Sequence, residues 1–212
     1  MAEQILTIIN AENNDRETAL EKQLSLLPEE TREAAEKAYR AWLNEDYEIA
    51  ERRCRRLLQS TSHLEIQLLL GQCYFAQGKW LEASELFREL LEEYPEEAEI
   101  RLYLGMSYHA LGSFEKAVDE LEKLWPPQEY SPFYFTSYGD SLQMTGKKRQ
   151  ARDVFYKEVE QYEKTGEILS AEMTDGAYQN LLYLDLALAN GAYQRDMDSY
   201  LCFLEHAEIT PK

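Results

Sequence analysis

The chain has 212 residues, with 40 acidic side chains against 22 basic ones and a formal net charge of −18. Such a charge repels the phosphates of nucleic acids and of anionic membranes, so we expect neither as a partner. The length suffices to bury a sizeable core, either in one domain or in one continuous array.

Residues 1–30 are expected to form an N-terminal helical cap. They carry two short apolar stripes, Ile5, Ile8 and Ile9, and then Leu20, Leu24 and Leu27, before Pro28 ends the second one. We expect them to cover the open face of the repeat that follows. An alternative is that the segment around Ile5–Ile9 folds into a groove as a built-in ligand. The run lacks the basic residues and length of a secretory signal, so the expected location is cytoplasmic.

Residues 64–161 repeat one pattern three times. The columns are Leu70-Gly71, Leu104-Gly105 and Tyr138-Gly139; Tyr74, Tyr108 and Leu142; Gly78, Gly112 and Gly146; Ala83, Ala117 and Ala151; and Phe87, Leu121 and Phe155. Each column steps by 34 residues. A period of this size indicates a unit of two helices repeated in tandem.

At these columns the chain resembles the tetratricopeptide repeat family, whose Leu-Gly, Tyr, Ala and Phe slots are filled in residues 64–95. The resemblance implies an all-α fold, a right-handed α-solenoid of about five antiparallel helix pairs. We expect the array to span residues 31–165, in units of 31–63, 64–97, 98–131 and 132–165. An inserted loop at 166–176 and a degenerate capping helix pair at 177–212 should follow, because end units shield the stack from water.

The turns inside the units carry their own signals. Gly78 and Gly112 should supply the positive φ that ends a first helix. In the first unit Asn44-Glu45-Asp46 replaces the glycine, and Asn and Asp tolerate this conformation. After the glycine turns, Trp80 and Phe114 should pack where the two helices of a pair meet.

No residue set indicates catalysis, a metal site or a cofactor. The three histidines, His63, His109 and His206, are far apart and have no Cys or Asp at ligand or triad spacing. The three cysteines, Cys54, Cys73 and Cys202, each fall in an apolar helical pattern, which favours buried reduced thiols. The sequence therefore predicts a protein that is not an enzyme.

The first helix of each unit should line the concave side, where proteins of this family usually bind. We define the inner line as the residues that share this face by helical spacing but lie outside the core slots. The predicted groove residues on it are Tyr39, Trp42, Leu68, Gln72, Phe75, Leu102, Met106, His109, Phe133, Thr136, Asp140 and Gln143, and Glu65 and Glu99 fall on the same line. We expect these side chains to form an apolar binding surface that the stack itself does not bury. The alternative is that some of them pack against the next repeat or the N-terminal segment.

The favoured function is a protein-interaction adaptor that binds a peptide or amphipathic segment, apolar or basic, of another protein. The sequence does not fit the Lys/Asn/Arg clamp with which some tetratricopeptide proteins hold chaperone tails, because none of the clamp positions holds one of those residues. Two alternatives stay open, namely a self-associating structural protein that forms a homodimer and a small chaperone for a secreted protein.

Overall fold

The computed structural model describes residues 24–25, 27–127 and 132–165. Within these ranges the chain forms eight α-helices and one short 3-10 helix, and no strand occurs there. It divides into two compact units between residues 129 and 130. The expected N-terminal cap up to residue 23, the loop at 166–176 and the helix pair at 177–212 lie outside the described residues.

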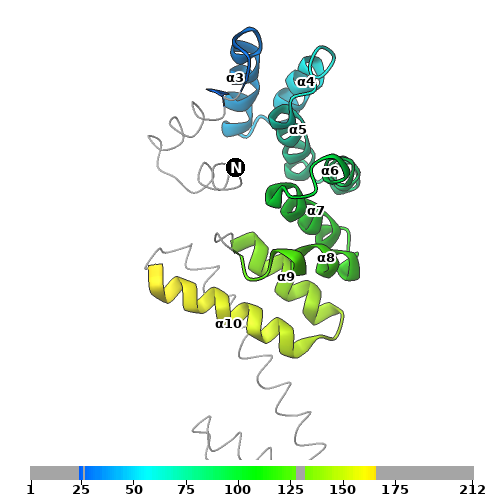
Figure 1. Ribbon diagram of the computed structural model, residues 1–212, viewed down its shortest axis with the longest axis vertical. Coiled ribbons are helices and arrows are strands. Elements are labelled where there is room, and N and C mark those ends of the chain that lie inside the picture. Colours follow the sequence, from blue (N-terminus) through cyan, green and yellow to red (C-terminus); the bar gives the residue numbers. More distant parts are fainter. Residues whose placement is uncertain (1–23, 26, 128–131, 166–212) are drawn as a thin grey trace, which may run out of the picture. The chain divides into compact units, whose positions relative to one another are not determined.

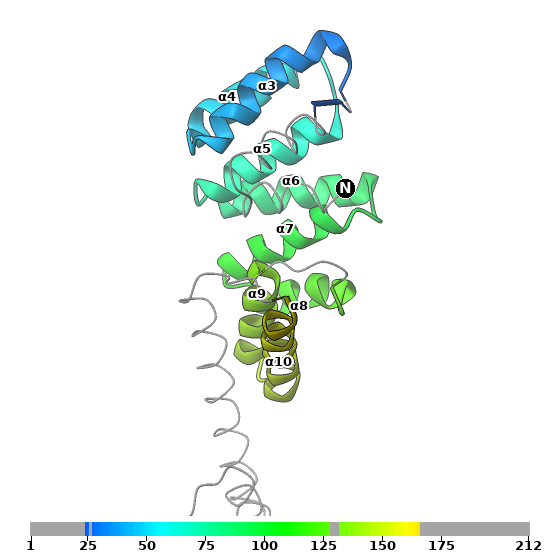
Figure 2. The same ribbon diagram turned by 90° about the vertical axis from the view of Figure 1, so that its left-hand side faces the viewer.

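The first unit contains three successive helix pairs (Figure 1). They are α3 (Glu29–Leu43) with α4 (Tyr47–Leu57), α5 (Leu64–Ala76) with α6 (Trp80–Glu93), and α7 (Ala98–Ala110) with α8 (Phe114–Leu121), followed by the 3-10 turn η1 (Glu122–Leu124). Each helix packs against the next one along the chain, and Figure 2 shows the pairs stacked in chain order. The second unit contains the pair α9 (Pro132–Met144) and α10 (Lys148–Thr165), which pack on each other.

The repeated glycines end the first helices as predicted. Gly78, Gly112 and Gly146 have φ values of 72°, 71° and 77°, a region that side-chain-bearing residues seldom enter. In the first pair the segment 44–46 replaces the glycine turn as predicted, but the positive φ falls on neither Asn44 nor Asp46. Glu45 holds the positive φ, 64°, while backbone hydrogen bonds to the carbonyls of Trp42 and Ala41 fix the turn around it.

The two helices of a pair touch where the small residues repeat. Ala83 on α6 is fully buried, and a Cβ built on Gly71 of α5 would lie 2.5 Å from the ring of Phe87. The third pair repeats this contact between Gly105 and Leu121, again at 2.5 Å. The Leu-Gly column therefore sets how closely the two helices approach, because a methyl group at this point would enter the facing side chain.

Two apolar clusters form the core of the first unit. One joins α3, α4 and α5 around Ala38, Cys54 and Leu69, and the other joins α5, α6 and α7 around Phe87 and Ile100. Apolar side chains thus bridge both junctions between the pairs of this unit, which is how a repeat array gains stability from neighbours.

One local expectation needs correction. Trp80, predicted to pack between its two helices, is 40 % exposed at the start of α6. Pro28 directly precedes α3 as its N-cap residue. Phe114 is half-buried and contacts the ring of His109 at 5.8 Å between centroids, as a packed aromatic should.

Candidate functional site

The inner line of the first unit is more buried than the sequence predicted. Five of its residues, Tyr39, Leu68, Gln72, Leu102 and Met106, are 2–7 % exposed. Three others, Trp42, Phe75 and His109, are half-buried. The expectation that the whole line lies exposed was wrong for the first five residues, although their assignment to a binding groove stays a prediction.

Contacts between successive first helices explain part of this burial. The Tyr39 hydroxyl on α3 donates to the backbone carbonyl of Glu65 on α5, at 3.3 Å. Leu68 on α5 belongs to the apolar cluster that reaches Tyr103 and Leu104 on α7. Helical spacing predicts which face a residue occupies, but it says nothing about how closely the next repeat approaches that face.

In the second unit the predicted groove residues lie on α9 and are more open. Phe133 is 42 % exposed, Thr136 is exposed, and Asp140 and Gln143 are half-buried. Burial and the charge of Asp140 raise the pKa of Glu158 on α10 to about 7. The two carboxyl groups, one on α9 and one on α10, therefore lie near each other.

The inner line of the first unit contains one buried polar pair. The Gln72 side-chain amide on α5 donates to a carboxylate oxygen of Glu99 on α7, at 2.9 Å. Both residues are at most 4 % exposed. Burial raises the pKa of Glu99 to about 8, because a carboxylate loses its hydration there.

Unpartnered polar atoms gather on the same line. Three buried side-chain atoms of the described residues have no hydrogen-bond partner: the indole Nε1 of Trp42 and the amide oxygens of Gln67 and Gln72. Two of the three residues, Trp42 and Gln72, are predicted groove residues. Buried polar groups in native proteins are nearly always paired, so each exception requires an explanation.

Aromatic rings support this surface from behind. The Phe75 ring meets the Tyr103 ring edge-on at 5.9 Å, and Tyr103 stacks on Phe87 at 5.3 Å. These contacts connect a half-buried inner-line residue to the core cluster of α5, α6 and α7. The ring of Phe75 is therefore held in place instead of moving freely at the surface.

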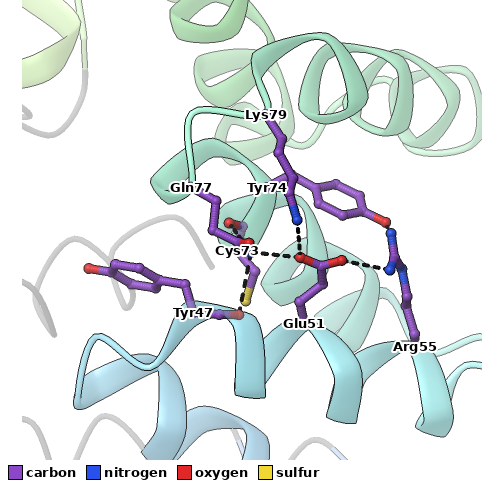
Figure 3. Close-up of polar contacts among 7 residues, drawn as sticks. All are labelled: Tyr47, Glu51, Arg55, Cys73, Tyr74, Gln77 and Lys79. Carbon is purple, nitrogen blue, oxygen red and sulfur yellow. Dashed lines mark hydrogen bonds and ion pairs between the residues drawn. The ribbon is translucent and has the colours of Figure 1, made fainter.

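A second polar site, which the sequence analysis missed, joins the first two helix pairs (Figure 3). Glu51 on α4 is 4 % exposed and accepts hydrogen bonds from the Lys79 ammonium and the Gln77 amide, both at 2.7 Å. Arg55 pairs with the other oxygen of Glu51 at 2.7 Å and lies over the Tyr74 ring. Glu51 has no distinguishing signal in sequence, because its partners other than Arg55 are 26 and 28 residues away.

The charges around Glu51 determine its ionisation. Burial opposes the carboxylate, but the hydrogen bonds from Lys79 and Gln77 and the charge of Arg55 outweigh it. The pKa of Glu51 therefore lies below its usual value. The carboxylate stays ionised at neutral pH, which suits a structural clamp between repeats and not an acid or base catalyst.

The described residues provide no place for a metal ion, because no group of three potential ligands occurs among them. Within the same residues no helix is long and apolar enough to cross a membrane. Cys54 and Cys73 are free and buried, as predicted, whereas Cys202 lies outside the described residues.

Comparisons with known proteins agree with the repeat architecture. The model of the family "Anaphase-promoting complex, cyclosome, subunit 3" matches residues 43–124. No curated protein matches the sequence. Among solved structures, MamA MSR-1 has a TM-score of 0.61 at 17% identity, over 82% of this chain and 95% of its own.

Two further structures resemble the chain to a similar degree. A thermophilic TPR protein of Thermus thermophilus has a TM-score of 0.59 at 18% identity, over 80% of this chain and 90% of its own. The TPR-like repeats of a putative kinesin light chain from Podosopora anserina have a TM-score of 0.56 at 18% identity, over 85% of this chain and 97% of their own. These likenesses, together with the helix pairs and their glycine turns, show that the chain has an all-α helical-repeat fold of the tetratricopeptide type.

Proposed function

We propose that the chain is a protein-interaction module that binds an apolar or amphipathic segment of another protein along the inner line. Tetratricopeptide-type folds generally mediate protein–protein interaction. The observation that carries the proposal is the pair of unpartnered polar atoms on this line, Trp42 Nε1 and Gln72 Oε1. A peptide backbone supplies the matching groups, a carbonyl for the indole and an N–H for the amide oxygen.

Half-buried rings add the apolar part of such a site. Trp42, Phe75 and His109 occupy the same slot of three successive first helices, at steps of 33 and 34 residues. Burying one large apolar side chain is worth about 1.5–3 kcal/mol. Two or three such contacts, after ordering costs, support roughly micromolar binding. The proposed module is therefore an adaptor of moderate affinity, with no catalytic role.

The experiment is affinity capture with the full chain, followed by mass spectrometry and by direct titration of the captured protein. Phe75→Ala should weaken binding by about tenfold, since one aromatic contact of about 1.4 kcal/mol is lost. Tyr39 is a poor choice because it is buried, and its loss would disturb the fold. Tyr156→Ala is the matched control, because this ring on α10 is 62 % exposed and outside the inner line.

Equal binding by wild type, Phe75→Ala and Trp42→Ala would refute the inner-line site. A partner lost equally with Tyr156→Ala would show that the surface lies elsewhere. The narrower role of a small chaperone for a secreted protein would appear as a captured protein that stays soluble only in the complex.

Self-association is the second candidate, favoured by exposed apolar side chains away from the inner line. Trp80 and Leu81 begin α6 and are 40 % and 57 % exposed, and Leu111 is 38 % exposed. Leu111 is the equivalent, one repeat later, of Gln77, whose side-chain amide donates to the carbonyl of Tyr47 at 3.4 Å. Because Tyr47 is the equivalent of Trp80, we infer that Leu111 lies near the start of α6. Light scattering on a sizing column tests this candidate. A dimer that Leu81→Asp converts to a monomer supports it, and a monomer at roughly tens of micromolar excludes it.

A further inference from the structure

Helix α4 presents a cluster of basic side chains to the solvent. Its core side is marked by Cys54, which is fully buried. The opposite side carries four exposed residues at the i, i+3, i+4 and i+7 spacing of one helix surface: Ile49, Arg52, Arg53 and Arg56. We call this surface the arginine face. It combines one apolar side chain, 36 % exposed, with three guanidinium groups.

Two of these guanidinium groups have no partner. Arg53 donates a hydrogen bond to the backbone carbonyl of Lys37 on α3. Arg52 and Arg56 make no hydrogen bond, ion pair or ring contact within the part of the chain that the structure describes. The exposed Glu48 lies four residues before Arg52, at the spacing of a helical ion pair, but these two side chains form none. The charged ends of Arg52 and Arg56 are therefore open to a group from outside the chain.

Other exposed basic residues of the first unit use the acids around them. Three of them pair with a glutamate four residues away on their own helix: Lys37 with Glu33, Arg40 with Glu36, and Arg88 with Glu92. Arg52 and Arg56 instead place two like charges four residues apart, which is unfavourable for a helix. Their charges therefore do not help to hold the fold together.

The residue types and their spacing indicate which group binds there. A guanidinium presents a planar fork of donors that matches a carboxylate, and it is more weakly hydrated than an ammonium. Residues 52–56 contain arginines and no lysine. Arg52 and Arg56 are separated by about 6 Å along the helix axis. Two carboxylates have that separation when they are four residues apart on a helix or two apart in an extended segment.

We propose that the arginine face docks an acidic segment of a protein partner, with one carboxylate on Arg52, one on Arg56 and an apolar side chain on Ile49. A nucleic acid is a poorer fit, because the net charge of −18 repels a long phosphate backbone. The arginine face lies on a second helix, whereas the inner line lies on first helices. This inference therefore goes beyond the proposed function and does not depend on it.

The acidity of the chain makes this proposal easy to isolate. The molecule as a whole repels an acidic peptide, so one that binds must meet a local basic surface. The second unit contains a matched comparison in Lys147 and Lys148, which are also exposed. These two lysines are adjacent in sequence, so they do not share a helix surface as Arg52 and Arg56 do.

The test is the selection of displayed random peptides of about 16 residues by the full chain at about 0.15 M salt, where long-range repulsion is screened. Wild type should enrich peptides with two Asp or Glu residues spaced by four or by two, beside an apolar residue. The double variant Arg52→Gln/Arg56→Gln should lose this class of peptide. Lys147→Gln/Lys148→Gln removes the same charge and should retain the class.

Direct titration with the most enriched acidic peptide then measures the contact. Arg52→Gln/Arg56→Gln should weaken binding by about tenfold, because two charge-assisted contacts are lost. Ile49→Asp should have a similar effect, since it removes the apolar contact and adds a repelling charge. The lysine double variant and Phe75→Ala, which alters the inner line, should each change the affinity by less than about twofold.

The inference would be overturned if wild type enriched no acidic peptide, or if the acidic class persisted in Arg52→Gln/Arg56→Gln. A wild-type dimer that this variant makes monomeric, without peptide binding, would instead assign the face to a second copy of the chain. Binding of a single-stranded oligonucleotide of about 20 thymidines, lost in the same variant, would assign the face to nucleic acid and also overturn the inference.

The proposed function stands or falls separately, on the apolar peptides that Phe75→Ala should lose. Circular dichroism checks the fold of each variant. Arg52 and Arg56 are exposed and make no contact within the described residues, so their replacement should leave the helix content unchanged. Should the arginine double variant misfold, Ile49→Asp provides the second reading, and full binding by it would overturn the inference.

Discussion

The carboxylate of Glu51 accepts a hydrogen bond from the ammonium of Lys79 at 2.7 Å, across the junction of the first two helix pairs. Glu51 is on α4 and Lys79 precedes α6, so the contact links two units of the array. The neighbouring apolar cluster joins α3, α4 and α5. Apolar packing therefore joins the helices of the two pairs, and the contact between Glu51 and Lys79 adds a polar link beside the turn that precedes α6.

We expect Glu51→Ala to lower the free energy of unfolding by about 1–2 kcal/mol. Hydrogen bonds to charged groups contribute more than neutral ones, but Lys79 and Arg55 are partly exposed and can regain water. Urea unfolding followed by circular dichroism measures the change. Glu85→Ala, an exposed acid on α6, should change stability by less than about 0.5 kcal/mol. Equal effects of the two variants would contradict the clamp.

The contact between Gly71 and Phe87 gives a second prediction. Gly71→Ala gains helix propensity, worth about 1 kcal/mol, but its methyl group would enter the Phe87 ring and force a shift costing about 1–3 kcal/mol. We therefore expect a net loss of stability in the wild-type background. In a Phe87→Ala background, where the ring is gone, the same substitution should be neutral or stabilising. A double-mutant cycle in urea tests this coupling, and additive effects would disprove the contact.

The repeat period predicted the fold well because its signals are local. A glycine that ends a helix needs only its own positive φ, and Gly78, Gly112 and Gly146 each have it. Helix α10 begins at Lys148, two residues after the turn glycine Gly146. The exception is Glu45, where hydrogen bonds of the surrounding turn impose a conformation that the residue type does not favour.

The candidate site was predicted less completely, because its properties arise between repeats. Spacing placed Gln72 and Glu99 on one face, but it could not show that their side chains meet and exclude water. Glu51 resembled the many solvated acids of an acidic chain, since Lys79 and Gln77 reach it only through the turn of the next pair. The repeat pattern of the sequence does not show which side chains of different repeats contact each other, so these contacts could not be predicted.

The two buried thiols should be unreactive in the folded chain. Cys54 and Cys73 are fully buried, and the hydrogen bond of the Cys73 thiol to Cys54, together with burial, raises the pKa of Cys73, so its thiolate is scarce. In a Cys202→Ser background, iodoacetamide at about pH 8 should label neither residue in native buffer and both in denaturant. Mass spectrometry counts the labels, and labelling of either cysteine in native buffer would contradict the described packing.

Stability should depend on pH through Glu99. Its pKa is about 8 in the folded chain, against 4.5 for an unperturbed glutamate, so the folded state holds more protons than the unfolded state between these values. The free energy of unfolding should therefore fall as pH rises from about 5 to 8, by at most about 1.4 kcal/mol per pH unit from this group. Glu51 has a lowered pKa, so the stability that its carboxylate contributes is lost only as pH falls below the usual pKa of a glutamate.

Glu99→Gln isolates this effect from the other acids of the chain. The variant keeps the side-chain shape and cannot ionise, so its stability relative to wild type should rise with pH. Near pH 8 its free energy of unfolding should exceed that of wild type by on the order of 1–2 kcal/mol. Glu89→Gln, on the exposed face of α6, should follow the wild-type curve at a constant offset. Urea unfolding at about pH 5, 6.5 and 8 measures the three curves. If Glu99→Gln ran parallel to wild type, Glu99 would be ionised throughout, and the buried pair would need a cation within the chain itself.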